Sequence, residues 1–395
     1  MTNEELLSRG VEEIVVRRSL EAKLAQRRTL KIKHGVDPTT QNLHLGYAVV
    51  YEKLRQFQAR GHIIQFLIGG FTARFGDPTD RSERRPLRPK TEVESLARGY
   101  IAQLSKILDI SLIELRSNSE WYDSMTAENI LNLLSSTSVQ RMLERDMFQA
   151  RLKRGTEIGL HEIAYPLLQG YDSVKLGSDA TVIGRDQKFN ELQARPLQIA
   201  AGQAPQDLVI MPLLVGTDGK RKMSQSYGNS INFNDAPNDM YGKIMSISDT
   251  EIINYFTLVT RLPQKDIKEI EQSIKRGGNP RDAKAKLALE ITSIYHSKNQ
   301  AIKAENYFNT VFRDRKTPSE HRRLWYDTEP KLIDVVVGSE EKHLSKSEAK
   351  RLLKQGAVEV DGKVIKDAEA KVPIYGIVKV GKRRFVRIDT YKNTK

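Results

Sequence analysis

Two kinds of pattern alternate through the first 230 residues of the chain. Residues 30–36 and 63–69 are short strand-like stretches, whereas residues 47–60 and 91–108 have the longer spacing of amphipathic helices. Further strand candidates are residues 180–183 and 208–215. Because strands that alternate with helices usually form a parallel sheet covered by helices, this part of the chain predicts an α/β fold.

The pattern changes in the last 160 residues. Residues 238–307 are nearly all helical in spacing, with breaks at Pro263 and at residues 277–280. The polar stretch 316–330 predicts a linker. No internal repeat is present.

A small α+β module is expected at the C-terminal end. Residues 345–355 have the pattern of a short basic amphipathic helix. Two short apolar runs flank Asp361-Gly362, a pair that favours a hairpin turn, and further short strands are expected between residues 373 and 388. Basic residues are concentrated on the helix and at residues 382–384.

Composition adds a charge argument. The 395 residues include 64 Lys+Arg and 50 Asp+Glu, a formal net charge of +14, and no cysteine. Residues 331–395 hold 16 Lys+Arg against 9 Asp+Glu, so half of the net charge lies in the last sixth of the chain. This excess favours a polyanionic partner such as nucleic acid. The lack of cysteine excludes disulfides, Cys-ligated zinc and a thiol nucleophile.

No apolar run approaches the ~20 residues that span a bilayer. Glu4 and Glu5 stand where a secretory leader would be basic and then apolar. We therefore expect a soluble cytoplasmic protein without a membrane partner.

The stretch 35–47 lies between a predicted strand and a predicted helix that begins at Asn42 or His44. Free N–H groups at a helix N-terminus bind phosphate. His44 can donate to phosphate oxygens, and Gly46 lets a flat base approach the backbone. Taken alone, this stretch fits a solvated loop histidine better.

The stretch 216–229 also follows a predicted strand. It carries Lys220, Arg221 and Lys222 among serines and glycines. A basic loop of this kind suits a polyphosphate that gains charge in a transition state. A surface loop without function has the same composition.

Polar side chains recur at helical spacing in residues 165–172. Tyr165, Gln169 and Asp172 are at i, i+4 and i+7, so they share one face if the segment is a helix, with Pro166 in its first turn. The pattern predicts a pocket wall with hydrogen-bonding tips, although a solvated face has the same spacing. Asp77 lies in a turn after a buried strand, near the sheet edge where α/β folds bind ligands.

Together these stretches resemble the bacterial tyrosyl-tRNA synthetases, a family of class I aminoacyl-tRNA synthetases. His44-Leu-Gly-Tyr47 is similar to the family's HIGH signature, and Lys222-Met-Ser-Gln-Ser226 is similar to its KMSKS loop. Residues 71–78, 165–172 and 186–190 resemble its tyrosine-pocket segments, and the C-terminal module resembles an S4-type RNA-binding domain.

The resemblance implies a Rossmann-like catalytic domain at residues 1–233, a helical anticodon-binding domain at 234–325 and an S4-like domain at 331–395. It implies that tyrosine is activated with ATP and Mg²⁺ to tyrosyl-adenylate and then transferred to tRNA(Tyr). It implies no metal site on the protein itself. A homodimer is also implied, because residues 139–153 resemble the region near the family's dimer interface.

Roles for individual residues follow from the same resemblance. Catalysis is expected from His44, Gly46, Lys222 and Gln225. ATP is expected to contact Asp37, Thr39, His44, Gly46, Tyr47, Asp186, Lys222 and Gln225, with Asp186 on the ribose. Tyrosine is expected to contact Asp77, Tyr165 and Gln169 through its ammonium, Asp172 through its hydroxyl, and Gln187 through its carboxylate. RNA is expected to contact Lys346, Lys350, Arg351 and Lys354.

Four residues depart from the family's pattern. Tyr47 replaces the second histidine of the first signature, and Gln225 replaces the second lysine of the mobile loop. Arg185 replaces a small residue, and Lys33 stands where one branch of the family has a pocket tyrosine. A neutral amide does not replace an ammonium at a developing charge. Two alternatives stay open: a synthetase-like RNA-binding protein that has lost activation, and a synthetase for tryptophan.

Overall fold

The computed structural model describes residues 2–26, 28–79, 87–313, 322–339, 344–381 and 384–390. It divides into two compact units, Met1–Lys298 and Asn299–Lys395, and each is described by itself. The boundaries of the three expected domains stay a prediction.

A six-stranded sheet forms the centre of the first unit, in the order β1-β6-β5-β2-β3-β4. The strands are β1 (Glu13–Val15), β2 (Lys31–Val36), β3 (Ile63–Ile68), β4 (Ile113–Ser117), β5 (Ala180–Gly184) and β6 (Asp207–Met211). Strands β2 to β6 pair in parallel, and β1 pairs antiparallel with β6. The predicted α/β fold with a parallel sheet is therefore confirmed.

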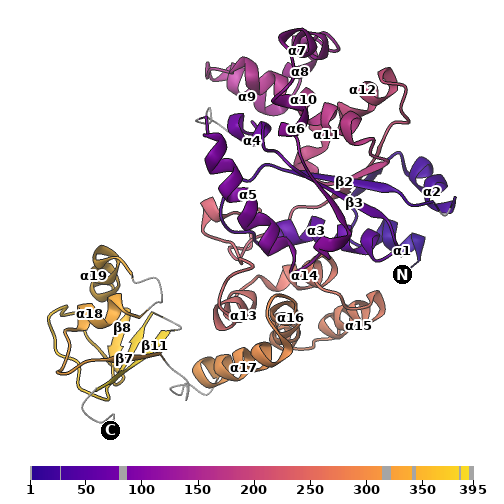
Figure 1. Ribbon diagram of the computed structural model, residues 1–395. Helices are drawn as coiled ribbons and strands as arrows, with labels where there is room; N and C mark the ends of the chain where they lie inside the picture. Colours follow the sequence, from indigo (N-terminus) through magenta and orange to yellow (C-terminus); the bar gives the residue numbers. More distant parts are fainter. Residues whose placement is uncertain are drawn as a thin grey trace. The chain divides into compact units, whose positions relative to one another are not determined.

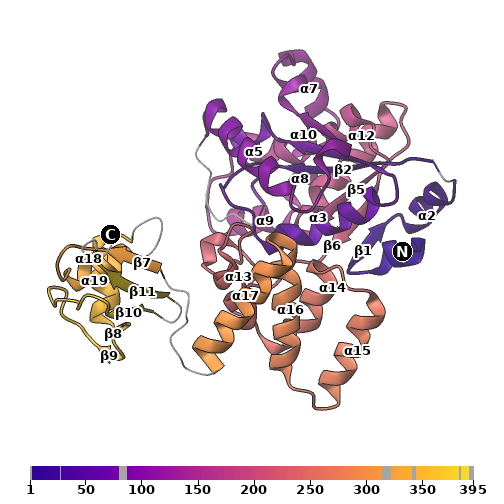
Figure 2. The same cartoon turned by 60° about the horizontal axis from the view of Figure 1, so that its bottom comes forward.

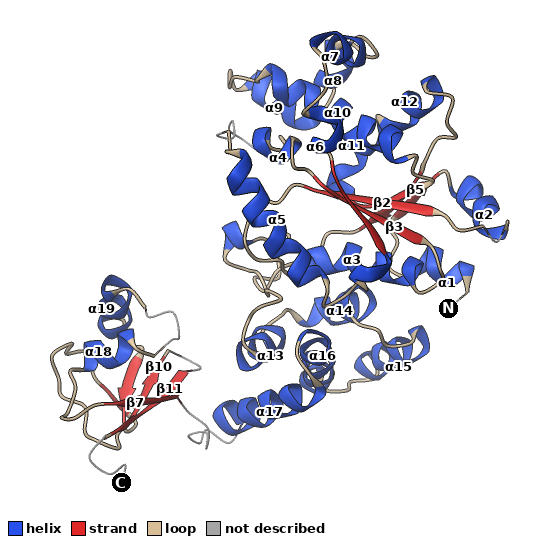
Figure 3. Cartoon of the chain, viewed as in Figure 1, coloured by secondary structure: helices blue, strands red, loops and turns tan. Residues whose placement is uncertain are grey.

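Helices cover both faces of this sheet, as Figures 1 and 3 show for α3 on one side and α10 on the other. The helices up to β6 are α1 (Asn3–Ser8), α2 (Arg17–Ala25), α3 (Leu45–Gln58), α4 (Thr72–Phe75), α5 (Lys90–Leu104), α6 (Ser119–Tyr122), α7 (Ala127–Leu134), α8 (Val139–Leu143), α9 (Asp146–Lys153), α10 (Leu160–Leu176), α11 (Lys188–Leu192) and α12 (Ala194–Ala200). Leu54 and Phe57 of α3 and Ile64 and Phe66 of β3 are among the buried side chains of the core.

Helix α10 begins earlier than its proline suggests. Pro166 lies inside the helix, so its expected place in the first turn was wrong. The Glu162 carboxylate accepts from the backbone N–H of Gly159 at 2.7 Å, and this bond starts the helix at Leu160. The predicted common face of Tyr165, Gln169 and Asp172 is nevertheless present, because the helix continues to Leu176.

The segment after the sheet is helical as predicted. Its helices are α13 (Pro237–Met245), α14 (Ile252–Val259), α15 (Gln264–Lys275), α16 (Pro280–Tyr295) and α17 (Lys298–Phe308), followed by a π-helical turn at Asn309–Arg313. From Asn299 on, α17 and this turn belong to the second unit. Helix α14 packs against α3, so this segment supports the helix that begins at the first signature.

The second unit contains a five-stranded sheet in the order β7-β11-β10-β8-β9 with two helices beside it (Figure 2). Its elements are β7 (Arg322–Trp325), α18 (Leu332–Val337), α19 (Lys346–Lys354), β8 (Val358–Val360), β9 (Lys363–Val364), β10 (Ile377–Val380) and β11 (Arg384–Asp389). Asp361 and Gly362, both at positive φ, join β8 and β9 in the predicted hairpin. Residues 322–325 are not linker as expected, because they pair in parallel with β11.

Among the described residues, every helix is too short or too polar to cross a bilayer.

Candidate active site

A cavity of about 660 Å³ opens at the carboxyl ends of β2 and β5. Its walls include Asp37, which follows β2, and Gly184 and Asp186 at the end of β5. Strand order reverses between these two neighbours, since β2 leads to β3 on one side while β5 lies on the other. This crevice is the usual ligand site of open α/β sheets.

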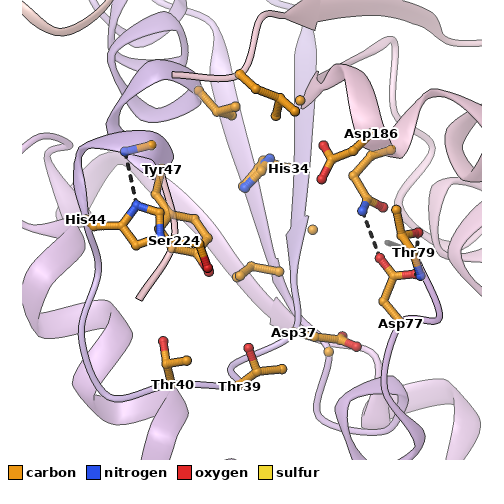
Figure 4. A pocket seen from close by; sticks show the side chains of 18 of the residues that line it. His34, Asp37, Thr39, Thr40, His44, Tyr47, Asp77, Thr79, Asp186 and Ser224 are labelled. Carbon is orange, nitrogen blue, oxygen red and sulfur yellow. Dashed lines mark hydrogen bonds between the residues drawn. The ribbon is translucent and has the colours of Figure 1, made fainter. Parts of the chain in front are cut away.

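All residues expected to bind ATP or tyrosine line this one cavity, although they come from segments up to 188 positions apart. They are Asp37, Thr39, His44, Gly46, Tyr47, Asp77, Tyr165, Gln169, Asp172, Asp186, Gln187, Lys222 and Gln225. Figure 4 shows His44 and Tyr47 on one side of the cavity and Asp77 and Asp186 on the other. Their individual roles stay predictions.

His44 is the N-cap of α3 and is held as a neutral imidazole. Its Nδ1 accepts from the backbone N–H of Gly46 at 3.1 Å, and burial lowers its pKa to about 4. The proton of the neutral ring therefore sits on Nε2, which is a donor. A Cβ on Gly46 would lie 2.8 Å from His44 Cε1, so the glycine makes room for this ring.

Tyr47, which stands in place of the second signature histidine, belongs to an aromatic cluster. Its ring centroid lies 4.6 Å from that of His44 and 6.2 Å from those of Tyr51 and Tyr100. Tyr51 and Tyr100 are buried. The residue thus forms an apolar wall beside the neutral His44.

Backbone hydrogen bonds join the first expected phosphate-binding segment to residues 231–233, which come just after the second. Leu45 N donates to Ile231 O, and Phe233 N donates to Leu43 O, both at 2.9 Å. Met223 N donates to Leu214 O at 2.7 Å, which ties the base of the second loop to the end of the sheet.

Gln225 bridges the two loops through its side chain. Its Nε2 donates to Asn42 O at 2.7 Å. Arg221 is turned toward Asp218, 3.0 Å away, and its guanidinium lies 4.5 Å from the centre of the Tyr227 ring. Lys222 lines the cavity, whereas Lys220 and Arg221 do not. The two other cations of this loop therefore stand outside the cavity and do not replace the lysine that Gln225 displaces.

The face of α10 meets buried donors and acceptors. Tyr165 donates to Asp37 Oδ2 at 2.8 Å, and burial raises the tyrosine pKa, with Asp37 adding to the effect. Asp172 accepts from Trp121 Nε1 at 3.1 Å and from Asn118 Nδ2 at 3.3 Å. Burial raises the pKa of Asp172 to about 7, against the opposing charge of Lys33.

Asp77 is held at both carboxylate oxygens. Oδ1 accepts from the backbone N–H of Thr79 at 2.9 Å and from its hydroxyl at 2.6 Å. Oδ2 accepts from Gln187 Nε2 at 2.8 Å, the contact drawn in Figure 4. Gln187, expected at the substrate carboxylate, thus also orients Asp77.

Sequence patterns missed several residues of the cavity, among them His34, Thr79 and Asn118. His34 Nδ1 donates to Val182 O at 2.9 Å, and burial lowers the pKa of the ring to about 4. His34 could have been predicted as a site residue because it is a polar residue within a strand whose neighbours are apolar and buried. Thr79 and Asn118 lie in turns and are recognisable only by their contacts with Asp77 and Asp172.

Arg185 and Lys33, the other two departures from the family's pattern, lie in different surroundings. Arg185 is exposed and lies 3.5 Å from Glu12, on the β1 side of the unit. Lys33 is fully buried, and its Nζ contacts Ser173 Oγ at 2.7 Å and Glu191 Oε1 at 3.0 Å. Within the described ranges, no cluster of His, Asp or Glu is arranged to hold a metal ion.

The expected RNA-contacting residues lie on α19 of the second unit. Lys346, Lys350, Arg351 and Lys354 are all exposed, while Ala349 and Leu353 of the same helix are buried. Residues 382 and 383, also expected to be part of the basic surface, lie outside the described residues.

Comparison with known families and curated proteins agrees with this arrangement. Residues 25–313 match the family "tRNA synthetases class I (W and Y)", and residues 332–374 match the S4 domain. The chain is 46% identical over 396 residues to a tyrosine–tRNA ligase of Thermotoga maritima, covering 98% of both chains. It is 41% identical to that of Moorella thermoacetica, covering 98% of this chain and 95% of the relative.

Solved structures share the fold. A truncated mitochondrial tyrosyl-tRNA synthetase of Aspergillus nidulans superposes with a TM-score of 0.66 at 22% identity, covering 78% of this chain and 93% of that one. The tyrosyl-tRNA synthetase of Archaeoglobus fulgidus, complexed with L-tyrosine, gives a TM-score of 0.61 at 22% identity, covering 76% and 98%.

Proposed function

The chain belongs to the class I tRNA synthetases for tryptophan and tyrosine, and we propose that it is a tyrosine–tRNA ligase whose active site is the cavity at the ends of β2 and β5. Sequence identity of 41% and 46% to tyrosine–tRNA ligases, over nearly the whole chain, supports the activity. The convergence of the expected residues on one cavity supports the site.

The first step joins tyrosine to ATP. The tyrosine carboxylate forms a bond to the α-phosphorus, the bond from that phosphorus to the β-phosphate oxygen breaks, and pyrophosphate leaves with Mg²⁺. Nucleophile and leaving group are both anionic, so the protein contributes position and electrostatic stabilisation rather than a general base. In the second step the 3′-terminal ribose hydroxyl of tRNA(Tyr) attacks the carbonyl carbon, and AMP leaves.

The ATP end uses the two joined loops. His44 Nε2–H donates to a phosphate oxygen from a ring that is neutral at pH 7, so it adds no charge of its own. Lys222 brings the ammonium that faces the pyrophosphate. Asp186, at the end of β5, accepts from the ribose.

At the tyrosine end of the cavity, Asp172 recognises the amino acid. The assignment of tyrosine as the substrate rests on the burial of this carboxyl group. A buried acceptor at this point pairs with a phenolic hydroxyl. Phenylalanine would offer no donor to the acceptor site of Asp172 that faces the cavity, and an acceptor left without a donor in the protein interior is costly. Asp77, Tyr165 and Gln169 supply oxygen acceptors for the ammonium.

Amino-acid-dependent exchange of pyrophosphate into ATP tests this function. We expect exchange with tyrosine and not with phenylalanine or tryptophan. Exchange with tryptophan would establish the tryptophan enzyme instead. Loss of exchange with all three, together with retained tRNA binding, would establish the RNA-binding protein without activation.

The exposed basic face of α19 is proposed to contact tRNA(Tyr). We also propose a cytoplasmic location, which the proposed role in translation supports.

A homodimer is proposed through the apolar surface of α7 to α10. Three of its side chains are unusually exposed: Leu160 at 82%, Leu131 at 66% and Val139 at 55%. Helix α10 packs against both α7 and α8, and exposed apolar side chains on such neighbouring helices are typical of an interface. Light scattering should give twice the chain mass for the native protein and a single-chain mass for Leu131→Glu. A native monomer would contradict the proposal.

A further inference from the structure

We infer that the buried pair Lys33 and Glu191 sets the orientation of the Gln169 amide, so that its oxygen faces the ammonium of the substrate. The inference rests on the proposed tyrosine site and deepens it. Lys33 and Glu191 are then positioning residues that act through Gln169.

Glu191 is a fully buried carboxylate on α11. Its Oε1 lies 3.0 Å from Lys33 Nζ and accepts from Gln169 Nε2 at 2.9 Å. Its Oε2 accepts from Gln206 Nε2 at 2.8 Å. A carboxylate only accepts hydrogen bonds. The NH₂ group of Gln169 must therefore face Glu191, and its carbonyl oxygen must face the other way.

The orientation is passed on through Asn190. Its Nδ2 donates to Gln169 Oε1 at 2.9 Å and to Gln187 Oε1 at 3.2 Å. Gln187 is thereby left with its NH₂ group toward Asp77, to which it donates at 2.8 Å. One chain of hydrogen bonds thus starts at Glu191 and ends at Asp77, and it fixes two of the proposed ammonium acceptors.

Gln169 Oε1 still has acceptor capacity after this contact, because a carbonyl oxygen has two lone pairs. Gln169 lines the cavity, so the second lone pair is available to a substrate ammonium. A reversed amide would present NH₂ to a cation and repel it. The orientation therefore decides whether Gln169 attracts or rejects the amino group.

Lys33 holds the carboxylate of Glu191 in place. Its Nζ lies 3.0 Å from Glu191 Oε1 and donates to Oε2 at 3.2 Å. Without this cation the buried carboxylate would lose its charge partner, which is costly, and Gln169 would lose a fixed acceptor. The three N–H groups of Lys33 are matched by Glu191, Ser173 Oγ and Gln169 O at 2.7–3.1 Å, so the lysine acts through its partners.

The test compares tyrosine with 3-(4-hydroxyphenyl)propionate, which lacks only the ammonium. In Glu191→Gln the new amide can donate to Gln169 Oε1, which reverses Gln169 while volume is kept. We expect the dissociation constant for tyrosine, measured by titration calorimetry, to rise roughly 10- to 100-fold. We expect that of the deamino analogue to change less than about 3-fold.

Glu162→Gln is the matched control, because Glu162 is also a buried carboxylate but pairs with Arg151 on α9. We expect no difference between the two ligands there. In the double variant Gln169→Glu with Glu191→Gln, the carboxylate stands at position 169 and cannot be reversed, so tyrosine affinity should return.

Equal weakening of both ligands in Glu191→Gln, or no weakening, would overturn the inference and leave the proposed function intact. Failure of the double variant to recover tyrosine affinity would also overturn it. Failure of the unsubstituted protein to bind either ligand would instead contradict the proposed tyrosine site itself.

Discussion

Individual buried side chains determine which charged groups the cavity presents to its ligands. Asp172 is a buried carboxyl whose pKa is raised to about 7, and His44 is a buried imidazole whose pKa is lowered to about 4. In both cases burial disfavours the charged form. At neutral pH the ATP end therefore holds a neutral donor, while the tyrosine end holds a carboxyl that is close to its titration point.

Asp172 should make the fold less stable as the pH rises. Its unfolded pKa is near 3.8 and its folded pKa is about 7, so the folded state binds more protons between these values. The free energy of unfolding of the native protein should fall, relative to that of Asp172→Asn, as the pH rises from about 4 to about 7. Urea unfolding of both proteins across this range measures the difference. A constant difference would contradict the raised pKa.

Gln225→Lys should raise the rate of adenylate formation. The variant brings an ammonium to the loop that faces the developing charge of the pyrophosphate, and preorganised charge at this point lowers the barrier. We expect about a 10-fold increase or more in single-turnover rate. Gln225→Met is the control, because it removes the bond to Asn42 O without adding charge. An unchanged rate in the lysine variant would mean that other groups already supply this charge.

The residues that sequence predicted share one property. His44, Gly46 and Lys222 lie in short contiguous signatures that are recognisable without a fold. Glu191 and Asn118 act through residues 22 to 158 positions away, as their contacts with Lys33, Gln169 and Asp172 show. Such hydrogen bonds form only when distant elements such as β2, α10 and α11 pack together, so no local sequence pattern predicts them.

Among the elements, α9 and α10 depend on one buried ion pair. The Arg151 guanidinium donates to Glu162 Oε1 at 2.8 Å and to Oε2 at 3.1 Å, and neither side chain reaches solvent appreciably. The pair thus joins α9 to the first turn of α10, ahead of the turns that carry Tyr165, Gln169 and Asp172.

Arg151→Met should destabilise the protein by about 3 kcal/mol, because it leaves a buried carboxylate without its cation. Chemical unfolding measures the loss. Arg154→Met is the matched control, since Arg154 is exposed at the end of the same helix, and it should change stability by less than about 0.5 kcal/mol. Equal effects of the two substitutions would contradict the assigned role of the pair.

Elements with strong periodicity were predicted, whereas three of the four edge strands among the described residues were not. Strands β2, β3 and β5 and helix α3 were found within a few residues of their bounds. Strands β1, β4 and β7 were missed. They lie at the edges of their sheets and keep partly exposed side chains, so their residues lack a continuous apolar pattern. The proline of α10 misled because the Glu162 cap starts the helix upstream.

At the scale of the whole molecule, the net charge of +14 should govern tRNA binding. Replacing Lys350 and Lys354 by Gln should reduce the slope of log affinity against log salt by roughly 1.5, because each phosphate contact contributes about 0.7 to 0.9. Filter binding across salt concentrations measures the slope. Lys363→Gln, on the exposed β9 strand, is the control for charge alone. An unchanged slope in the double variant would remove α19 from the interface.

The backbone bonds that tie the two signature regions to neighbouring segments have a consequence for amide hydrogen exchange. The N–H groups of Leu45, Met223 and Phe233 are bonded across segments, whereas those of Tyr227 and Gly228 are bonded only within one short exposed turn. The first group should stay protected while the second exchanges quickly, and ATP should slow only the second. The exchange rates of those two amides would then measure how often the turn at residues 224–228, beside the proposed ATP site, opens.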